Sequence, residues 1–223
     1  MKVVRNKFSI ALGIAFLLQS IAPLVSGAFL FDPLIDKGDI FKTMTNLTSH
    51  SFTAQLSFFL DVVTMIGIFW LGVLLYTLLN KLNKVWALTG LALYILEAVM
   101  HFTGKVFGNG LLRISELYTA TADASLVPLA QIFLQINKFL PALAMIPFGI
   151  GAILLYTLML KSKALPAWLM IWGLVSSLGI LIGVPLMAYG VPVPLIVAAP
   201  YVPFEFFTGA FILIRGLKCI VKD

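Results

Sequence analysis

The stretch ALPAWLMIWGLVSSLGILIGVPLMAYGVPVPLIVAAPYVPF, from Ala164 to Phe204, runs for 41 residues without a charged side chain. About 20 apolar residues in a helix are enough to cross the hydrocarbon core of a bilayer, which is about 30 Å thick. The stretch is therefore long enough to hold two membrane-spanning segments and their connection. Prolines at positions 192, 194, 200 and 203 predict that the connection falls between a span over 165–187 and another over 203–217.

The composition of the whole chain is also that of a membrane protein. Of its 223 residues, 61% are hydrophobic and only 11% are charged, and the mean hydropathy is +1.07. A soluble domain has about 25% charged residues, so we expect one all-α transmembrane domain over 1–223 that is surrounded by membrane lipids. The net charge of +6 does not indicate nucleic-acid binding, because the basic residues stand in short clusters between apolar spans. The single cysteine, Cys219, excludes a disulfide framework or a cysteine-based metal site within the chain.

Hydropathy predicts a bundle of six spans, at about 8–31, 52–79, 85–103, 135–160, 165–187 and 203–217. A cleaved signal peptide ending near Ser26-Gly27-Ala28 is an alternative for the first span, but its length favours a retained helix.

Two segments between the spans carry most of the remaining polar residues. Glycines at 104, 108 and 110 and three charged side chains predict an outer connection after the third span, with helix resuming from about Leu126. In the segment 32–51, Asp39 is a candidate N-cap for a short amphipathic helix that presents Ile40, Met44 and Leu47.

The orientation in the membrane follows from the basic residues. Ten of the 15 lysines and arginines lie near the two chain ends and in the turns at 80–84 and 161–164. The positive-inside rule therefore predicts a cell membrane protein with both termini in the cytoplasm. Aromatic residues at these basic ends are expected to anchor the interface, and they are Tyr76, Trp86, Tyr156 and Trp168.

A five-residue sequence, Leu-Leu-Tyr-Thr-Leu, occurs twice, at 74–78 and at 154–158. Each copy is followed by a lysine, a tryptophan and the next span, so the two hairpins would have the same orientation. A parallel duplication of two helical hairpins, as in some transporters, is one interpretation. A chance likeness of two leucine-rich helix ends is the other.

Four ionisable residues lie within predicted spans, where a charge costs at least a few kcal/mol. They are Asp61, Glu97, His101 and Glu205, on three different helices, and all are predicted in the outer half of the membrane. Glu97, His101 and Lys105 are spaced four residues apart and share one helical face.

These four residues support three interpretations. In the first, they line an outward-facing acidic cavity that binds or moves a small cation or a lipid group. In the second, they hold a metal ion in an intramembrane hydrolase, although the sequence has no H-E-x-x-H motif and no cofactor is predicted. In the third, the protein is a structural or partner-binding subunit, in which Glu97 pairs with His101 or Lys105 and Glu205 caps its own helix. A homo-oligomer or another membrane protein is a possible partner in each case.

Three short motifs resemble a bacterial and archaeal membrane family, the domain-of-unknown-function family 4386. The first runs from Leu75-Tyr76 to Lys81 and continues through Ala87-Leu88 to Leu96-Glu97-Ala98. The second is Leu165-Pro166-Ala167-Trp168-Leu169 followed by Gly173, and the third is Pro203-x-Glu205 leading to Leu213-Ile214-Arg215-Gly216. The resemblance implies six spans and no particular activity. Glu97 and Glu205 match its pattern, whereas His101 does not, and Ala167 stands where the family often has a basic residue.

Overall fold

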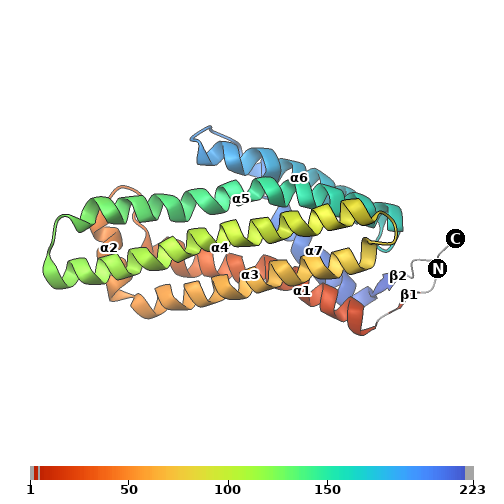
Figure 1. Ribbon diagram of the computed structural model, residues 1–223, viewed down its shortest axis with the longest axis horizontal. Helices are drawn as coiled ribbons and strands as arrows, with labels where there is room; N and C mark the ends of the chain where they lie inside the picture. Colours follow the sequence, from red (N-terminus) through yellow and green to blue (C-terminus); the bar gives the residue numbers. More distant parts are fainter. Residues whose placement is uncertain (1–2, 5, 219–223) are drawn as a thin grey trace.

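The computed structural model describes residues 3–4 and 6–218 and is almost entirely helical (Figure 1). Cys219 and the basic residues Lys2, Arg5 and Lys222 lie outside the described residues. The helices are α1 (Lys7–Leu24), α2 (Ile40–Ser49), α3 (Ser51–Leu79), α4 (Lys84–Thr121), α5 (Leu126–Ser162), α6 (Ala167–Ala188) and α7 (Tyr201–Arg215). Shorter elements are the π-helical turn η1 (Val25–Phe31), the 3-10 turns η2 (Asp32–Leu34) and η3 (Leu195–Val197), and the strands β1 (Val3–Val4) and β2 (Leu217–Lys218).

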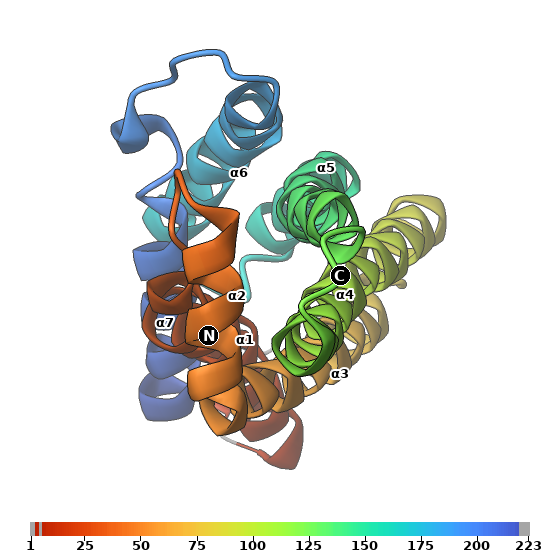
Figure 2. The ribbon, with the colours of Figure 1, turned by 90° about the vertical axis from the view of Figure 1, so that its left-hand side faces the viewer.

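Within the described residues, six helical segments are long and apolar enough to cross a membrane. They contain α1, α3, α4, α5, α6 and α7, and the prediction of an all-α integral membrane bundle with six spans is confirmed. The spans pack in a closed ring in the order α1, α3, α4, α5, α6, α7, and α7 returns to α1. The end-on view in Figure 2 separates α1, α6 and α7 from α3, α4 and α5.

Local sequence signals explain where several helices begin and end. Asn6 and Ser9 form a reciprocal capping box at the start of α1. The side chain of Asn83 accepts a hydrogen bond from the Trp86 N–H at the start of α4. Two non-glycine residues in the left-handed conformation, Ala122 (φ 54°) and Lys163 (φ 55°), end α4 and α5.

Both described chain ends lie at one end of the bundle, which we call the basic end. Strands β1 and β2 pair antiparallel there, with Val3 opposite Lys218 (Figure 1). The backbone N–H of Lys218 donates to the carbonyl of Ala164 at 3.0 Å, which ties β2 to the turn between α5 and α6. The Lys161 Nζ atom, in the last turn of α5, lies 5.2 Å from the centre of the Trp86 ring. This contact links the end of α5 to the start of α4.

The opposite end of the bundle, which we call the α2 end, holds a second small core. Met44 and Leu47 of α2 are buried against Leu111 and Leu112 of α4. Asp39 caps α2 by accepting a hydrogen bond from the Lys42 N–H, as predicted. At the same site, the hydrogen bond and ion pair with Lys42 lower the pKa of Asp36 to about 2.

The predicted outer connection after residue 103 is wrong, because α4 continues unbroken to Thr121. The glycines that indicated a break lie where α4 and α5 approach closely. A Cβ atom on Gly104 would stand 2.5 Å from Pro141, and one on Gly108 would stand 2.6 Å from Asn137. Small residues at such positions allow two helix backbones to pack tightly.

Helices α4 and α5 are much longer than the predicted spans 85–103 and 135–160. With 38 and 37 residues, each is roughly 55 Å long, almost twice the thickness of the hydrocarbon core. Arg113 and Glu116 form an exposed pair at 2.8 Å on the extension of α4. This charged extension of α4 packs against α2 in the second core. The start predicted for the helix at Leu126 is confirmed.

Candidate functional site

A cavity of about 290 Å³ lies inside the ring of helices, and all six spans contribute to its wall. Its polar part consists of Gln19, Ser20, Thr64, Glu97, His101, Tyr201 and Glu205. Its apolar part consists of Pro23, Leu24, Ile68, Met145, Phe148, Ile180 and Val202. Among the described residues, no lysine or arginine lines it, so two carboxyl groups dominate its electrostatics.

Glu205 is the best-connected side chain of this cavity. It is only 3% exposed, and its Oε1 atom accepts hydrogen bonds from the Gln19 amide at 2.7 Å and from the Tyr201 hydroxyl at 2.5 Å. The bond from Gln19 joins α1 to α7, the bond from Tyr201 lies within α7, and both hold the Glu205 carboxyl group at the central cavity. The predicted role of Glu205 as a cap of its own helix is wrong, because no side chain caps α7.

A row of tyrosine hydroxyls continues from Glu205 to the far side of the ring. The Tyr201 hydroxyl lies 3.0 Å from that of Tyr156, and the Tyr94 hydroxyl donates to Tyr156 at 3.5 Å. The row joins α7, α5 and α4, and Tyr94 and Tyr156 are fully buried. The interface position predicted for Tyr156 is therefore wrong.

Glu97 differs from Glu205 in its hydrogen bonding. It is also 3% exposed, yet its Oε2 atom has no hydrogen-bond partner among the described residues. Two other buried atoms of the cavity wall also have no partner among the described residues. They are the Nε2 atom of His101, one turn further along α4, and the Oε1 atom of Gln19. Neither His101 nor Lys105 pairs with Glu97 in the described structure. A buried polar group without a partner costs about 1–3 kcal/mol, so this part of the cavity wall is left unsatisfied.

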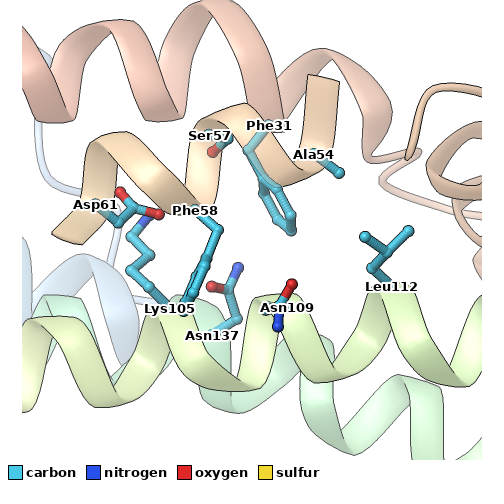
Figure 3. Close-up of a pocket in the computed structure, with 10 residues that line it drawn as sticks. Phe31, Ala54, Ser57, Phe58, Asp61, Lys105, Asn109, Leu112 and Asn137 are labelled. Carbon is cyan, nitrogen blue, oxygen red and sulfur yellow. The ribbon is translucent and has the colours of Figure 1, made fainter. Parts of the chain in front are cut away.

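Asp61 lies outside this cavity, in a separate polar cluster (Figure 3). Its Oδ1 atom accepts a hydrogen bond from the Ser26 hydroxyl at 2.6 Å and lies 4.0 Å from the Lys105 ammonium. The space beside it measures about 10 Å³, which is about the volume needed for one water molecule. Asp61 is thus satisfied by its neighbours.

The helical rise of 1.5 Å per residue gives the distance of Asp61, Glu97 and Glu205 from the basic end, measured along the helix that carries each residue. Asp61 lies about 27 Å from that end of α3, and Glu97 about 20 Å from that end of α4. Glu205 lies only about 15 Å from the end of α7, close to the middle of the membrane. Because α7 has only 15 residues, Glu205 lies nearer to the basic end than Asp61 and Glu97 do, and its position in the outer half of the membrane stays a prediction.

The family of the chain can be determined from its sequence. Residues 11–216 match a protein family described as Domain of unknown function (DUF4386). The chain belongs to this family. The match extends over parts of all six spans and includes every residue of the central cavity, and it confirms the resemblance to this family. No curated protein and no solved structure matches the chain.

Of the four candidate residues, Glu97, His101 and Glu205 share the central cavity and Asp61 does not. Among residues 3–4 and 6–218, no three His, Cys, Asp or Glu side chains are grouped so that they could hold a metal ion. Sequence reasoning missed Gln19 and Tyr201. The spacing of Tyr201 and Glu205, four residues apart after Pro200, could have revealed the second of these.

Proposed function

We propose that this protein binds a small ligand with an ammonium head group in the central cavity, between Glu97 and Glu205. The observation that supports this most strongly is the unpartnered Oε2 atom of Glu97. Asp61 has a hydroxyl and an ammonium group beside it, so a buried carboxylate in this bundle can be satisfied internally. Glu97 lacks such a partner, and an ionisable group inside a membrane is costly unless it pairs or acts.

The unsatisfied atoms specify the chemistry of the ligand. Glu97 Oε2 and Gln19 Oε1 are hydrogen-bond acceptors, so they require a ligand that donates hydrogen bonds. An ammonium group supplies both the donors and a charge opposite to that of the two carboxylates. The cavity volume of about 290 Å³ far exceeds the roughly 10–15 Å³ needed for one water molecule, which favours an organic cation over a single metal ion.

The mouth of the cavity is proposed to face the outer side of a cell membrane. Leu24 and Val202 are the exposed members of the wall, at 42% and 41%, and both lie at the ends of α1 and α7 remote from the basic end. The positive-inside rule places the basic end, and with it both termini, in the cytoplasm.

The test uses methylammonium as the probe and thermal unfolding of the purified protein in lipid nanodiscs as the readout. At one hundred times its dissociation constant, a bound ligand stabilises the folded state by about 2.7 kcal/mol. We expect methylammonium to raise the unfolding temperature of the natural sequence relative to sodium at equal ionic strength. Glu97→Gln and Glu205→Gln should fold and lose this stabilisation.

Glu116→Gln is the matched control, because Glu116 is the one glutamate of the chain besides Glu97 and Glu205. It lies outside the cavity and pairs with Arg113. It should respond to methylammonium like the natural sequence. An equal response in all four proteins, or none in the natural sequence, would contradict the proposal. Destabilisation of both cavity variants without any ligand effect would favour a structural subunit instead.

A further inference from the structure

A second and larger hollow lies between α5 and α6 toward the α2 end, and Phe107 of α4 also lines it. Figure 1 shows α6 diverging from α5 toward the end of α6. The hollow has a volume of about 900 Å³ and is mostly apolar. The residues that concern us are Lys138 and Ala142 on α5 and Val184 and Met187 on α6, and we call this hollow the α5–α6 groove.

The groove lies at the depth of lipid acyl chains. Lys138 stands at its rim, about 36 Å from the basic end of α5, which is at the level of the head groups. Val184 lies about 26 Å from the basic end of α6, within the hydrocarbon core. A lysine above an apolar surface is typical of a side chain that extends to the membrane interface. The groove is therefore open to lipid rather than to water.

The linings of the groove and of the central cavity come within one helical turn of each other on α5 and on α6. On α5, Ala142 lines the groove and Met145 lines the cavity. On α6, Val184 lines the groove and Ile180 lines the cavity. Residues three and four apart share a helical face and lie about one turn, or about 5 Å, from each other. One face of α5 and one face of α6 thus each line both the apolar groove and the cavity that contains the two carboxyl groups.

We infer that the ligand is a long-chain amphiphile from the membrane, whose ammonium head lies in the cavity and whose apolar chain lies in the α5–α6 groove. This inference rests on the proposed function and adds the class of ligand and its route of access. The charge of the cavity complements the head, and the apolar wall of the groove complements the chain. The ligand reaches the cavity sideways, from the leaflet at the α2 end.

The test uses dodecylamine with a photoreactive diazirine at the end of its chain, incorporated in vesicles that contain the full-length protein. Labelled positions are mapped by mass spectrometry. We expect labelling at Val184 and Met187 to exceed labelling at Ile182, which is 57% exposed on the outer surface of α6. Glu205→Gln should remove this excess, because the chain is held in the groove through its head.

A matched pair of substitutions tests the passage itself. Val184→Trp places a large side chain in the groove, whereas Ile182→Trp adds the same side chain on the lipid-facing surface. Val184→Trp should reduce labelling at Met187 roughly tenfold, equivalent to about 1.4 kcal/mol, and Ile182→Trp should leave it unchanged. Stabilisation by methylammonium should persist in both variants, which also shows that they are folded.

The outcomes separate the two proposals. Uniform labelling of the lipid-facing surface, or equal labelling of the two tryptophan variants, overturns the amphiphile inference. If methylammonium still stabilises the natural sequence in that case, the proposed binding of an ammonium head stands alone. If methylammonium has no effect and the labelling does not depend on Glu205, both proposals are overturned.

Discussion

Two buried carboxyl groups of the bundle have opposite surroundings. Asp61 receives a hydrogen bond from Ser26 and stands near Lys105, whereas Glu97 has an oxygen without a partner. The sequence identified both as candidates because both interrupt apolar spans. It could not distinguish them, because the partners of Asp61 lie on η1 and on α4, at sequence distances of 35 and 44 residues.

The contrast between Asp61 and Glu97 predicts opposite effects on stability. Asp61→Asn leaves the largely buried Lys105 without its partner, so the free energy of unfolding should fall by about 3 kcal/mol. Glu97→Gln removes a carboxyl group whose Oε2 atom has no partner among the described residues, so it should leave this free energy unchanged or raise it. Reversible unfolding in detergent, followed by tryptophan fluorescence, measures both changes.

The double variant Asp61→Asn with Lys105→Met is the control for the first effect. It should be more stable than Asp61→Asn alone, because no unpaired charge remains. A larger loss in Glu97→Gln than in Asp61→Asn would reverse the roles given to the two residues.

At the level of elements, the sequence predicted where helices begin better than how far they extend. The N-cap at Asp39 and the start at Leu126 follow from local composition and agree with the structure. The length of α4 does not follow from local composition. Taken alone, Gly104 and Gly108 predict a break in the helix. Their structural role is to make room for Pro141 and Asn137 of the neighbouring helix. The two tyrosines in the repeated Leu-Leu-Tyr-Thr-Leu sequences also differ, since Tyr156 is fully buried and Tyr76 only partly.

The close contact of α4 with α5 predicts that Gly104 tolerates no larger side chain. Gly104→Ala would place a methyl group against the rigid ring of Pro141, which stands 2.5 Å away. Overpacking of this kind costs about 1–3 kcal/mol, and thermal unfolding should report it. Gly27→Ala is the control, because no heavy atom of the described residues, apart from its chain neighbours and its own helix backbone, lies within 4 Å of the added methyl group. Equal stability of the two variants would show that α4 and α5 are not packed as described.

At the level of the whole molecule, hydropathy was sufficient to predict six spans in one bundle. It could not predict that the spans close into a ring, because apolar faces carry little information about which helix each one meets. The central cavity follows from that ring, and so does the grouping of Glu97 with Glu205. The tyrosine row was missed for the same reason, since it joins three helices that are distant in sequence.

The orientation of the bundle is a prediction that single-cysteine labelling can test. In a Cys219→Ser background, cysteines replace Thr45 on α2 and Asn83 at the basic end, both of which are exposed. A membrane-impermeant maleimide added to intact cells should label Thr45→Cys and spare Asn83→Cys. The reverse pattern would place the basic end outside.

The most direct test of the central claim uses solid-state nuclear magnetic resonance in lipid vesicles. The chain has only three glutamates, so selective carboxyl labelling with ¹³C gives three signals, which Glu97→Gln and Glu205→Gln assign. With ¹⁵N-methylammonium bound, we predict magnetisation transfer from the ligand nitrogen to the carboxyl carbons of Glu97 and Glu205, and none to Glu116. Transfer to Glu116 alone, or to none of the three, would contradict the binding of an ammonium head in the central cavity.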